Sequence, residues 1–178
     1  MNSIKPGLEW LDTNGCPIQA HAGQLFIEDG VYYWYGEDKS NMTVDVYGEP
    51  YHNGVRCYSS TDLYNWKDEG TILAPSDDEN SPLHYYRVVD RPHIIYNEKT
   101  KKYVMWIKFA GEKENLRNWK NQRAGVLVAD KLLGPYTLVK DFLPNGMHMG
   151  DFDFVKDGDK MFISVTLSTI RLTLLVCS

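Results

Sequence analysis

The chain repeats one pattern of short aromatic and apolar runs, and this repeat constrains its fold more than any single motif. The run QLFIEDGVYYWYGE is followed by GVRCYSSTDLYNW, and HIIYNEKTKKYVMWIK is followed by AGVLVADKLLGPY. Tyr32 and Tyr103 are 71 positions apart, as are Gly54 and Gly125. A third copy begins with FDFVKDGDKMFISV at Phe152. Recurrence of all-β units at a fixed period is typical of radial or stacked architectures.

Each complete unit predicts four short strands separated by turns. Asp29-Gly30 is a strong signal for a tight hairpin, and Asp157-Gly158 holds the same place in the third unit. We therefore predict an all-β chain, a β-propeller with four-stranded blades of which about two and a half are present. A β-sandwich is the alternative, although the recurring order of hairpin, loop and strand favours blades. The expected strands are 24–28, 31–36, 54–59 and 70–73, then 93–97, 103–109, 124–129 and 136–140, then 152–156, 160–166 and 172–177.

Residues 1–178 are expected to form one incomplete domain, the N-terminal part of a single β-propeller catalytic domain. Its units cover about 20–75, 90–142 and 150–178. Because the third unit stops partway, we expect a C-terminally truncated chain. Three polar segments interrupt the strands, and long loops of this kind are either functional or simply solvated. These segments are 38–52, 74–90 and 111–122.

Composition excludes several classes of function. The net charge is -5 with no dense basic cluster, which argues against a nucleic-acid partner. No run approaches the roughly 20 apolar residues that span a bilayer, so we expect no membrane partner. The N-terminus MNSIKPGLEW lacks the apolar segment of a secretory signal, so we expect a cytoplasmic chain as encoded and leave a secreted parent open. Cys16, Cys57 and Cys177 are odd in number and lack metal-ligand spacing, and Cys57 is expected in the core. We expect no cofactor and leave a structural calcium ion open.

Propeller geometry selects candidate site residues without a motif search. The first strand of each blade lines the axis, so the residues just before these strands gather at one mouth of the funnel. The second strand runs back and ends at the same mouth. Convergent carboxylates suit acid–base chemistry, because burial and mutual repulsion raise some pKa values while a nearby arginine lowers others. Alternatively, each residue caps a turn or pairs locally, as Asp90 could with Arg91. The selected residues are His21, Glu37, Asp90, Arg91, His93 and Asp151.

The second predicted strand adds an aromatic neighbour to Glu37. Side chains alternate along a strand, so Tyr33, Tyr35 and Glu37 share one face. A carboxylate beside an aromatic ring suits a sugar, because the ring stacks on C–H groups while the carboxylate binds hydroxyls. The alternative is that these tyrosines pack between blades.

Four stretches together resemble glycoside hydrolase family 43. They are AHAGQLFIEDGVYYWYGE, GVRCYSSTDLYNWKDEG, DRPHIIYNEKTKKYVMWI and NGMHMGDFDFVKDGDKMFI. The subgroup of galactan 1,3-β-galactosidases (exo-β-1,3-galactanases) is the most similar, and the resemblance runs from about Trp10 to the mid-170s. It implies a five-bladed propeller that hydrolyses glycosidic bonds with inversion, using an acid, a base and an aspartate that tunes the pKa of the acid.

The resemblance also implies roles for particular residues. Asp151 falls where the aspartate that tunes the pKa precedes the third blade. The usual position of the base reads Gln19-Ala20-His21-Ala22, without a carboxylate, as in the galactanase-like subgroup. Glu37 is the glutamate of the WYGE motif and His21 is a candidate substrate contact. The family's acid glutamate begins the fourth blade, which this chain does not reach. The last stretch, STIRLTLLVCS, fits the family less well.

We therefore expect an inverting glycoside hydrolase that acts on β-1,3-galactan or a related plant polysaccharide and is inactive or weak as this chain. The alternative is a non-catalytic carbohydrate-binding β-propeller. The expected partners are an oligo- or polysaccharide and, through open blade edges, further copies of the chain. The candidate catalytic residues are Asp151, Glu37 and Asp90, and the candidate substrate contacts are His21, Tyr35, Arg91 and His93.

Overall fold

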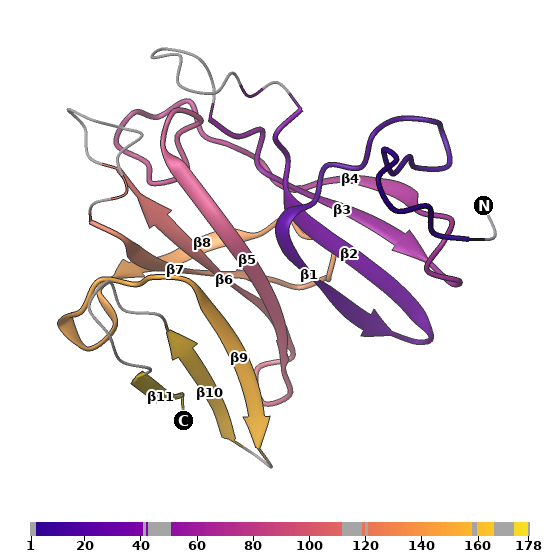
Figure 1. Ribbon diagram of the computed structural model, residues 1–178. Coiled ribbons are helices and arrows are strands. Elements are labelled where there is room, and N and C mark those ends of the chain that lie inside the picture. The colour runs from indigo at the N-terminus through magenta and orange to yellow at the C-terminus, as the bar shows by residue number, and fades with distance from the viewer. Residues whose placement is uncertain are drawn as a thin grey trace.

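The computed structural model describes residues 3–40, 42, 51–111, 119, 121–157, 160–165 and 173–177. In this part of the chain, antiparallel meanders form two four-stranded sheets and one three-stranded sheet (Figure 1). The first contains β1 (His21–Glu28), β2 (Val31–Glu37), β3 (Val55–Ser60) and β4 (Lys67–Leu73). The second contains β5 (Val88–Asn97), β6 (Lys102–Ala110), β7 (Arg123–Ala129) and β8 (Thr137–Phe142). The third contains β9 (Phe152–Asp157), β10 (Lys160–Val165) and β11 (Thr173–Cys177), and follows the short 3-10 helix η1 (Pro144–Gly146).

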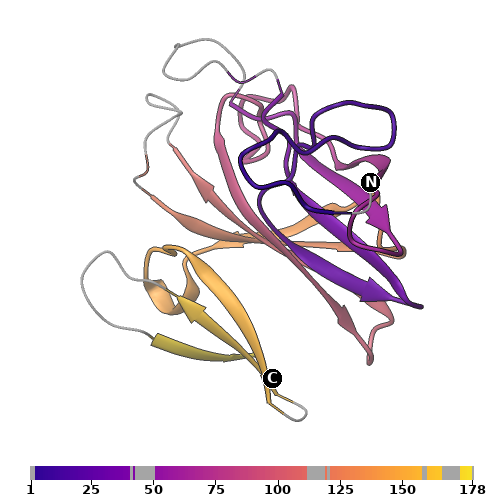
Figure 2. The same cartoon turned by 45° about the vertical axis from the view of Figure 1, so that its right-hand side comes forward.

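The three sheets are arranged as blades around a common axis. Figures 1 and 2 show them fanned out with β1, β5 and β9 turned toward the centre. Strand β5 contacts both β1 and β9, so the first strand of each sheet is the innermost, as predicted. This arrangement is that of a β-propeller, and the sandwich alternative is wrong. No helix among the described residues is long and apolar enough to cross a membrane.

Apolar side chains hold the blades together. Between the first and second blades, Tyr35 and Val55 pack with Ile94, Met105 and Leu127 in one buried cluster. A smaller cluster joins the second blade to the third. Cys57 belongs to the first cluster, as expected, and burial raises the pKa of its thiol to about 12, so it stays a thiol.

The N-terminal segment covers part of the other face of the first sheet. The ring of Trp10 lies 5.1 Å from that of Trp34 and 6.5 Å from that of Trp66, measured between centroids. Trp34 and Trp66 also meet edge to face, at 5.4 Å. These three indoles anchor the segment to the blade.

The inner strands differ from their prediction in one respect that matters for the site. Strands β1 and β5 begin several residues earlier than expected, at His21 and Val88. Each contains an irregularity, between His21 and Gln24 in β1 and between Asp90 and His93 in β5. Ala22 (φ 49°) and Arg91 (φ 52°) adopt left-handed backbone there. A bulge leaves extra residues unpaired and redirects their side chains. Residues expected before the strands therefore lie within them, at bulges.

Candidate functional site

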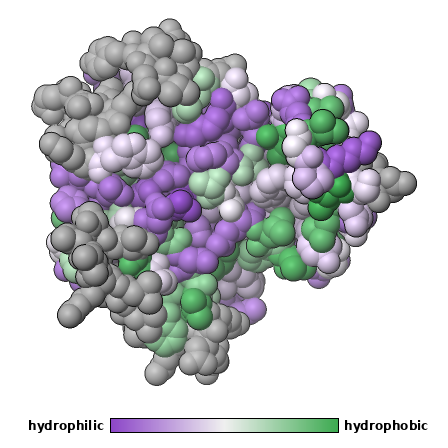
Figure 3. All heavy atoms as spheres, in the orientation of Figure 1, coloured by the Kyte–Doolittle hydropathy of each residue, from purple (hydrophilic) through white to green (hydrophobic). Residues whose placement is uncertain are grey.

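A pocket of about 560 Å³ lies where the three blades meet. Figure 3 shows hydrophilic side chains gathered in the middle of this face, between the lobes of the molecule. The pocket brings together five of the seven residues selected from the sequence: His21, Glu37, Asp90, Arg91 and Asp151. Ala22, Tyr51, Lys108, Trp119 and Gln122 complete its lining.

Glu37 ends β2 directly opposite His21, the first residue of β1. Its side chain is fully buried, with Oε1 3.5 Å from His21 Nδ1 and Oε2 2.5 Å from Lys39 Nζ. Burial raises the pKa of Glu37, and a hydrogen bond with Asp90 acts in the same direction, while His21 and Lys39 oppose both. The hydrogen bond with Glu37 raises the pKa of His21, whose side chain is 65% exposed. This corner therefore combines a buried carboxyl with an imidazole open to solvent.

Asp90 and Asp151 share the ammonium group of Lys108. Its Nζ lies 2.6 Å from Asp90 Oδ2 and 2.8 Å from Asp151 Oδ1. Burial works to raise the pKa of Asp90, but hydrogen bonds with Glu37 and Lys108 outweigh it and the pKa lies below its usual value. Burial is likewise outweighed at Asp151, whose pKa is lowered by Lys108 and Arg91. Both aspartates are thereby favoured as carboxylates.

Arg91 reaches across to the third blade rather than to its neighbour in sequence. Its Nη2 lies 2.7 Å from Asp151 Oδ2, so the local Asp90–Arg91 ion pair considered above is not the arrangement formed. The backbone N–H of Arg91 donates to Glu37 Oε1 at 3.4 Å. Arg91 therefore contacts both neighbouring blades from its left-handed position, the first through its backbone N–H and the third through its side chain.

His93 lies beside this pocket but outside it. It lines an adjoining cavity of about 330 Å³, which shares Ala22, Arg91 and Asp151 with the first. Its ring is buried, with Nδ1 3.0 Å from the Arg91 carbonyl oxygen and Nε2 3.5 Å from Asp153 Oδ1. Burial lowers the pKa of His93. We infer that its contact with the Arg91 carbonyl oxygen stabilises the bulge.

Tyr35 does not join the site. It is fully buried between the first two blades, and its hydroxyl oxygen accepts a hydrogen bond from the Ile94 N–H at 2.8 Å. Strand alternation is regular here, but the face that Tyr35 shares with Glu37 meets the second blade. Neither face of the ring is open to a ligand, so the prediction of a substrate contact is corrected, and the alternative of packing between blades applies.

Sequence reasoning missed four lining residues and the lysine that pairs with Glu37. Lys108 had a signal, because a single lysine within the apolar run YVMWIKFA is rarely buried unless it is paired. Tyr51 and Trp119 come from the polar segments 38–52 and 111–122, parts of which lie outside the described residues. Their rings meet edge to face at 6.4 Å, with Lys39 Nζ 3.8 Å from the Tyr51 centroid. Gln122 completes the set without a sequence signal.

The residues present do not fit a divalent cation. His21, Glu37 and Asp90 each offer a ligand atom within 4.8 Å of the others. However, the ammonium groups of Lys39 and Lys108 already lie on Glu37 and Asp90. An ion at this point would be repelled by both, and the exposed imidazole alone would not compensate.

Comparison with solved structures supports the resemblance to glycoside hydrolase family 43. Neither protein-family models nor curated proteins gave a match. Among solved structures, a family 43 β-1,3-galactosidase is 35% identical with a TM-score of 0.79, covering 93% of this chain and 34% of that one. An exo-β-1,3-galactanase from Phanerochaete chrysosporium with galactose is 32% identical with a TM-score of 0.80, covering 92% and 36%.

A third structure, an exo-β-1,3-galactanase from Clostridium thermocellum, is 29% identical with a TM-score of 0.72 and coverage of 91% and 35%. The chain thus spans about a third of the length of these three structures. Nearly all of it takes part in each match, and two of the identities exceed 30%. In sequence and in fold, the chain is a glycoside hydrolase family 43-like segment of a β-propeller, similar to the exo-β-1,3-galactanases.

Proposed function

We propose that this site serves an inverting glycoside hydrolase acting on β-1,3-galactan or a related plant polysaccharide, and that the chain supplies the part of the site that holds the sugar. One observation carries the proposal. Three carboxylates from three different blades, those of Glu37, Asp90 and Asp151, converge on one pocket beside the rings of Tyr51 and Trp119.

The balance of charge suits a neutral sugar. Lys39 pairs with Glu37, and Lys108 pairs with both Asp90 and Asp151. Arg91 provides a third cation at Asp151. A pocket whose charges are compensated internally still offers many donors and acceptors to hydroxyl groups, without attracting a charged ligand. The aromatic rings offer faces or edges to the C–H groups of a pyranose.

The spacing of the carboxylates suggests which of them bind the sugar and which takes part in catalysis. An inverting acid and base stand roughly 6.5–9.5 Å apart, which leaves room for a water molecule. Glu37 and Asp90 have carboxylate oxygens within 4.8 Å of each other, too close for that arrangement. We infer that this pair binds sugar hydroxyls together. We infer that Asp151, whose side chain is 51% exposed, acts on a further catalytic group.

We expect the general acid to lie outside the pocket that the described residues form. The resemblance places it in a further blade, and removal of a general acid typically costs about 10²–10⁴-fold in rate. The similar Phanerochaete chrysosporium structures hold galactose in one case and β-1,3-galactotriose in another. These ligands support the proposed substrate class and define the first sugars to test.

A non-catalytic carbohydrate-binding propeller is the second candidate. It is favoured by the position where the resemblance expects a base, which holds His21 rather than a carboxylate. It is also favoured by the pairing of every carboxylate in the pocket with a cation. This candidate predicts sugar binding of the same specificity without any hydrolysis.

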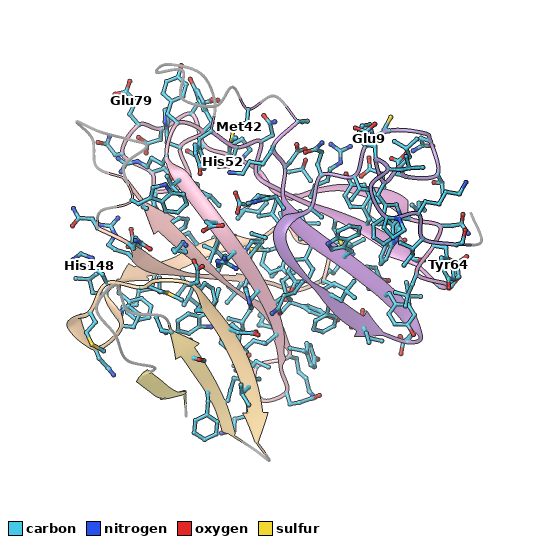
Figure 4. The ribbon with its side chains drawn as sticks, viewed as in Figure 1. Glu9, Met42, His52, Tyr64, Glu79 and His148 are labelled. Atoms are coloured by element: carbon cyan, nitrogen blue, oxygen red, sulfur yellow. The ribbon has the colours of Figure 1, made fainter. Side chains whose placement is uncertain are left out.

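Calorimetry with β-1,3-galactotriose, beside an aryl β-galactoside hydrolysis assay, separates these candidates. The variant Glu37→Gln keeps the shape of the side chain and is expected to weaken binding at least tenfold. Glu9→Gln is the matched control, because Glu9 is exposed on the N-terminal segment beside the first sheet (Figure 4). Slow hydrolysis that Glu37→Gln abolishes would support the hydrolase, and binding without hydrolysis the second candidate. Failure of the folded chain to bind any galacto-oligosaccharide would contradict both.

A further inference from the structure

Lys108 is the most completely buried cation of the pocket. It is 3% exposed and lies within β6, a strand whose other buried side chains are apolar. A lysine is almost never buried to this degree without a partner, because transfer of an ion from water to a protein interior costs on the order of several kcal/mol. Lys108 therefore depends on its two carboxylate partners for its position.

The two partners come from different blades. Asp90 lies directly opposite Lys108 in the pairing of β5 with β6. Asp151 immediately precedes β9, the first strand of the third blade. Since Nζ lies within 2.8 Å of an oxygen of each, one ammonium group fixes the distance between two carboxylates that no common strand holds. Trp119 adds a ring whose centroid is 4.9 Å from the same nitrogen.

The surroundings make this ammonium group electrostatically important. Asp90 also shares a hydrogen bond with Glu37, and Lys108 holds Asp151 beside Asp90, so three carboxyl groups are crowded within a small volume. Carboxylates that close raise one another's pKa, and an opposite charge within about 4–6 Å lowers it by 1–3 units. The neighbour of Lys108 on β7 is the uncharged Ala124. The titratable and charged groups around Lys108 and Asp90 are His21 from β1, Glu37 and Lys39 from the end of β2 and just beyond it, Arg91 from β5 and Asp151 from the third blade.

We propose that Lys108 is a positioning residue: it holds Asp90 and Asp151 ionised and at one fixed separation, and so sets the acid limit of the pH range in which the pocket binds a neutral sugar. The role in binding rests on the function proposed above, whereas the ionisation of the two aspartates does not. Lys108 acts on the sugar only through these carboxylates. Arg91 alone cannot replace it, because Arg91 reaches Asp151 and not Asp90.

The first test is the titration of the aspartate carboxyl carbons by NMR in the chain without ligand. Lys108→Met should raise the pKa of Asp90 or Asp151 by about 1–3 units. Lys102→Met is the matched control, because Lys102 is on the same strand but its side chain is 40% exposed and pairs with Asp130. Unchanged titration of both aspartates in a folded Lys108→Met variant would overturn the proposal.

Two further variants keep the proposal testable if Lys108→Met does not fold. Lys108→Arg retains the charge and should keep both carboxyl pKa values low. Asp90→Asn leaves Asp151 as the single carboxylate on Lys108, so the pKa of Asp151 should not rise. A rise in the pKa of Asp151 in Asp90→Asn would show that the ammonium group is not shared, and would overturn the proposal.

The pH profile of galactose binding links this role to the site. In Lys108→Met, the pH at which binding is half lost on the acid side should move up by the same 1–3 units as the carboxyl pKa, and Lys108→Arg should restore it. A uniform loss of affinity at every pH, without that displacement, would indicate a merely structural role and count against the proposal. If the unaltered chain binds no galactose, the proposed function fails, and the ligand-free titration still decides the role of Lys108.

Discussion

Single side chains in this protein are placed by hydrogen bonds that cross from one blade to another. Tyr35 is the clearest case, since its ring is buried in the core of the first two blades while its hydroxyl oxygen accepts the Ile94 N–H. The Gln24 amide likewise donates to Asp153 Oδ1 at 2.7 Å, from the first blade to the third. Such contacts fix the relative positions of the strands that present the site.

Tyr35→Phe should destabilise the fold by about 1–3 kcal/mol, because the Ile94 N–H would remain buried without an acceptor. Urea unfolding measures the change. Tyr64→Phe is the control, because Tyr64 is 37% exposed. Equal stability of the two variants would show that the Tyr35 hydroxyl does not support the contact between blades.

Arg56 makes stability depend on pH. It pairs with Asp68 and with Asp38, and burial at Asp38 is outweighed so that the pKa values of both aspartates are lowered. A lowered carboxyl pKa stabilises the fold above the unfolded value of about 3.9, and this stabilisation is lost as the pH falls through the folded value. Arg56→Met should therefore cost about 2 kcal/mol at pH 6 and much less near pH 2. A difference in unfolding free energy that stays constant between those pH values would contradict this assignment.

At the level of residues, sequence reasoning found the acidic members of the site together with His21 and Arg91, but not the lysines that pair with the carboxylates. His21, Glu37, Asp90, Arg91 and Asp151 could be selected because strand ends of a propeller meet at one mouth. Which cation meets which carboxylate depends on the strand register and on contacts between blades, which no local pattern encodes. For the same reason the orientation of Tyr35, toward the second blade rather than the pocket, could not be predicted.

Strands and hairpins were easier to predict than their irregularities. All eleven strands were expected within a few residues, because dipeptides such as Asp29-Gly30 mark the turns and β-branched or aromatic runs mark the strands. The bulges at Ala22 and Arg91 could not be predicted, since neither residue is a glycine and left-handed backbone is uncommon for residues other than glycine. These bulges persist because the surrounding sheet and its neighbours fix them.

Two glycines of the first blade should respond very differently to the same substitution. A Cβ added at Gly36 would lie 2.3 Å from the carbonyl carbon of Ala20, whereas nothing lies within 4 Å of one added at Gly30. Gly30→Ala, at φ 77°, should cost only about 1–2 kcal/mol through backbone strain. Gly36→Ala should cost more than 3 kcal/mol or abolish folding, because two backbone segments must separate, and overpacking typically costs about 1–3 kcal/mol even between flexible side chains. Thermal unfolding that ranked Gly30→Ala as the more damaging variant would contradict the close approach of Ala20 to β2.

Considered as a whole, the described molecule has an apolar face on its first blade that no other blade covers. Leu25 and Ile27 of β1 are 51% and 62% exposed. Phe26, between them, points the other way and packs on Tyr103 of the second blade. Exposed apolar side chains on an inner strand favour association with another sheet.

We therefore expect the chain to self-associate, as the open blade edges suggested from the sequence. Light scattering coupled to size-exclusion chromatography should detect species larger than one chain, and the double variant Leu25→Glu/Ile27→Glu should shift them toward the monomer. Val139→Glu is the control, because Val139 is 63% exposed on β8, at the opposite edge of the second blade from the inner strand β5. A single monomeric peak for the unaltered chain, with cooperative unfolding, would exclude the association.

The corresponding bulges of β1 and β5 also determine which positions of the site can be substituted. Because the backbone at each bulge is fixed by its blade, the side chains that it displays can be exchanged without rebuilding the strand. The first blade displays His21 where the second displays Asp90 and Arg91, at corresponding irregularities. In a propeller of this kind, each blade therefore presents its own side chains to the site, and those of one blade can be replaced without altering the others. New sugar specificities could be introduced one blade at a time, by substitutions at these few positions.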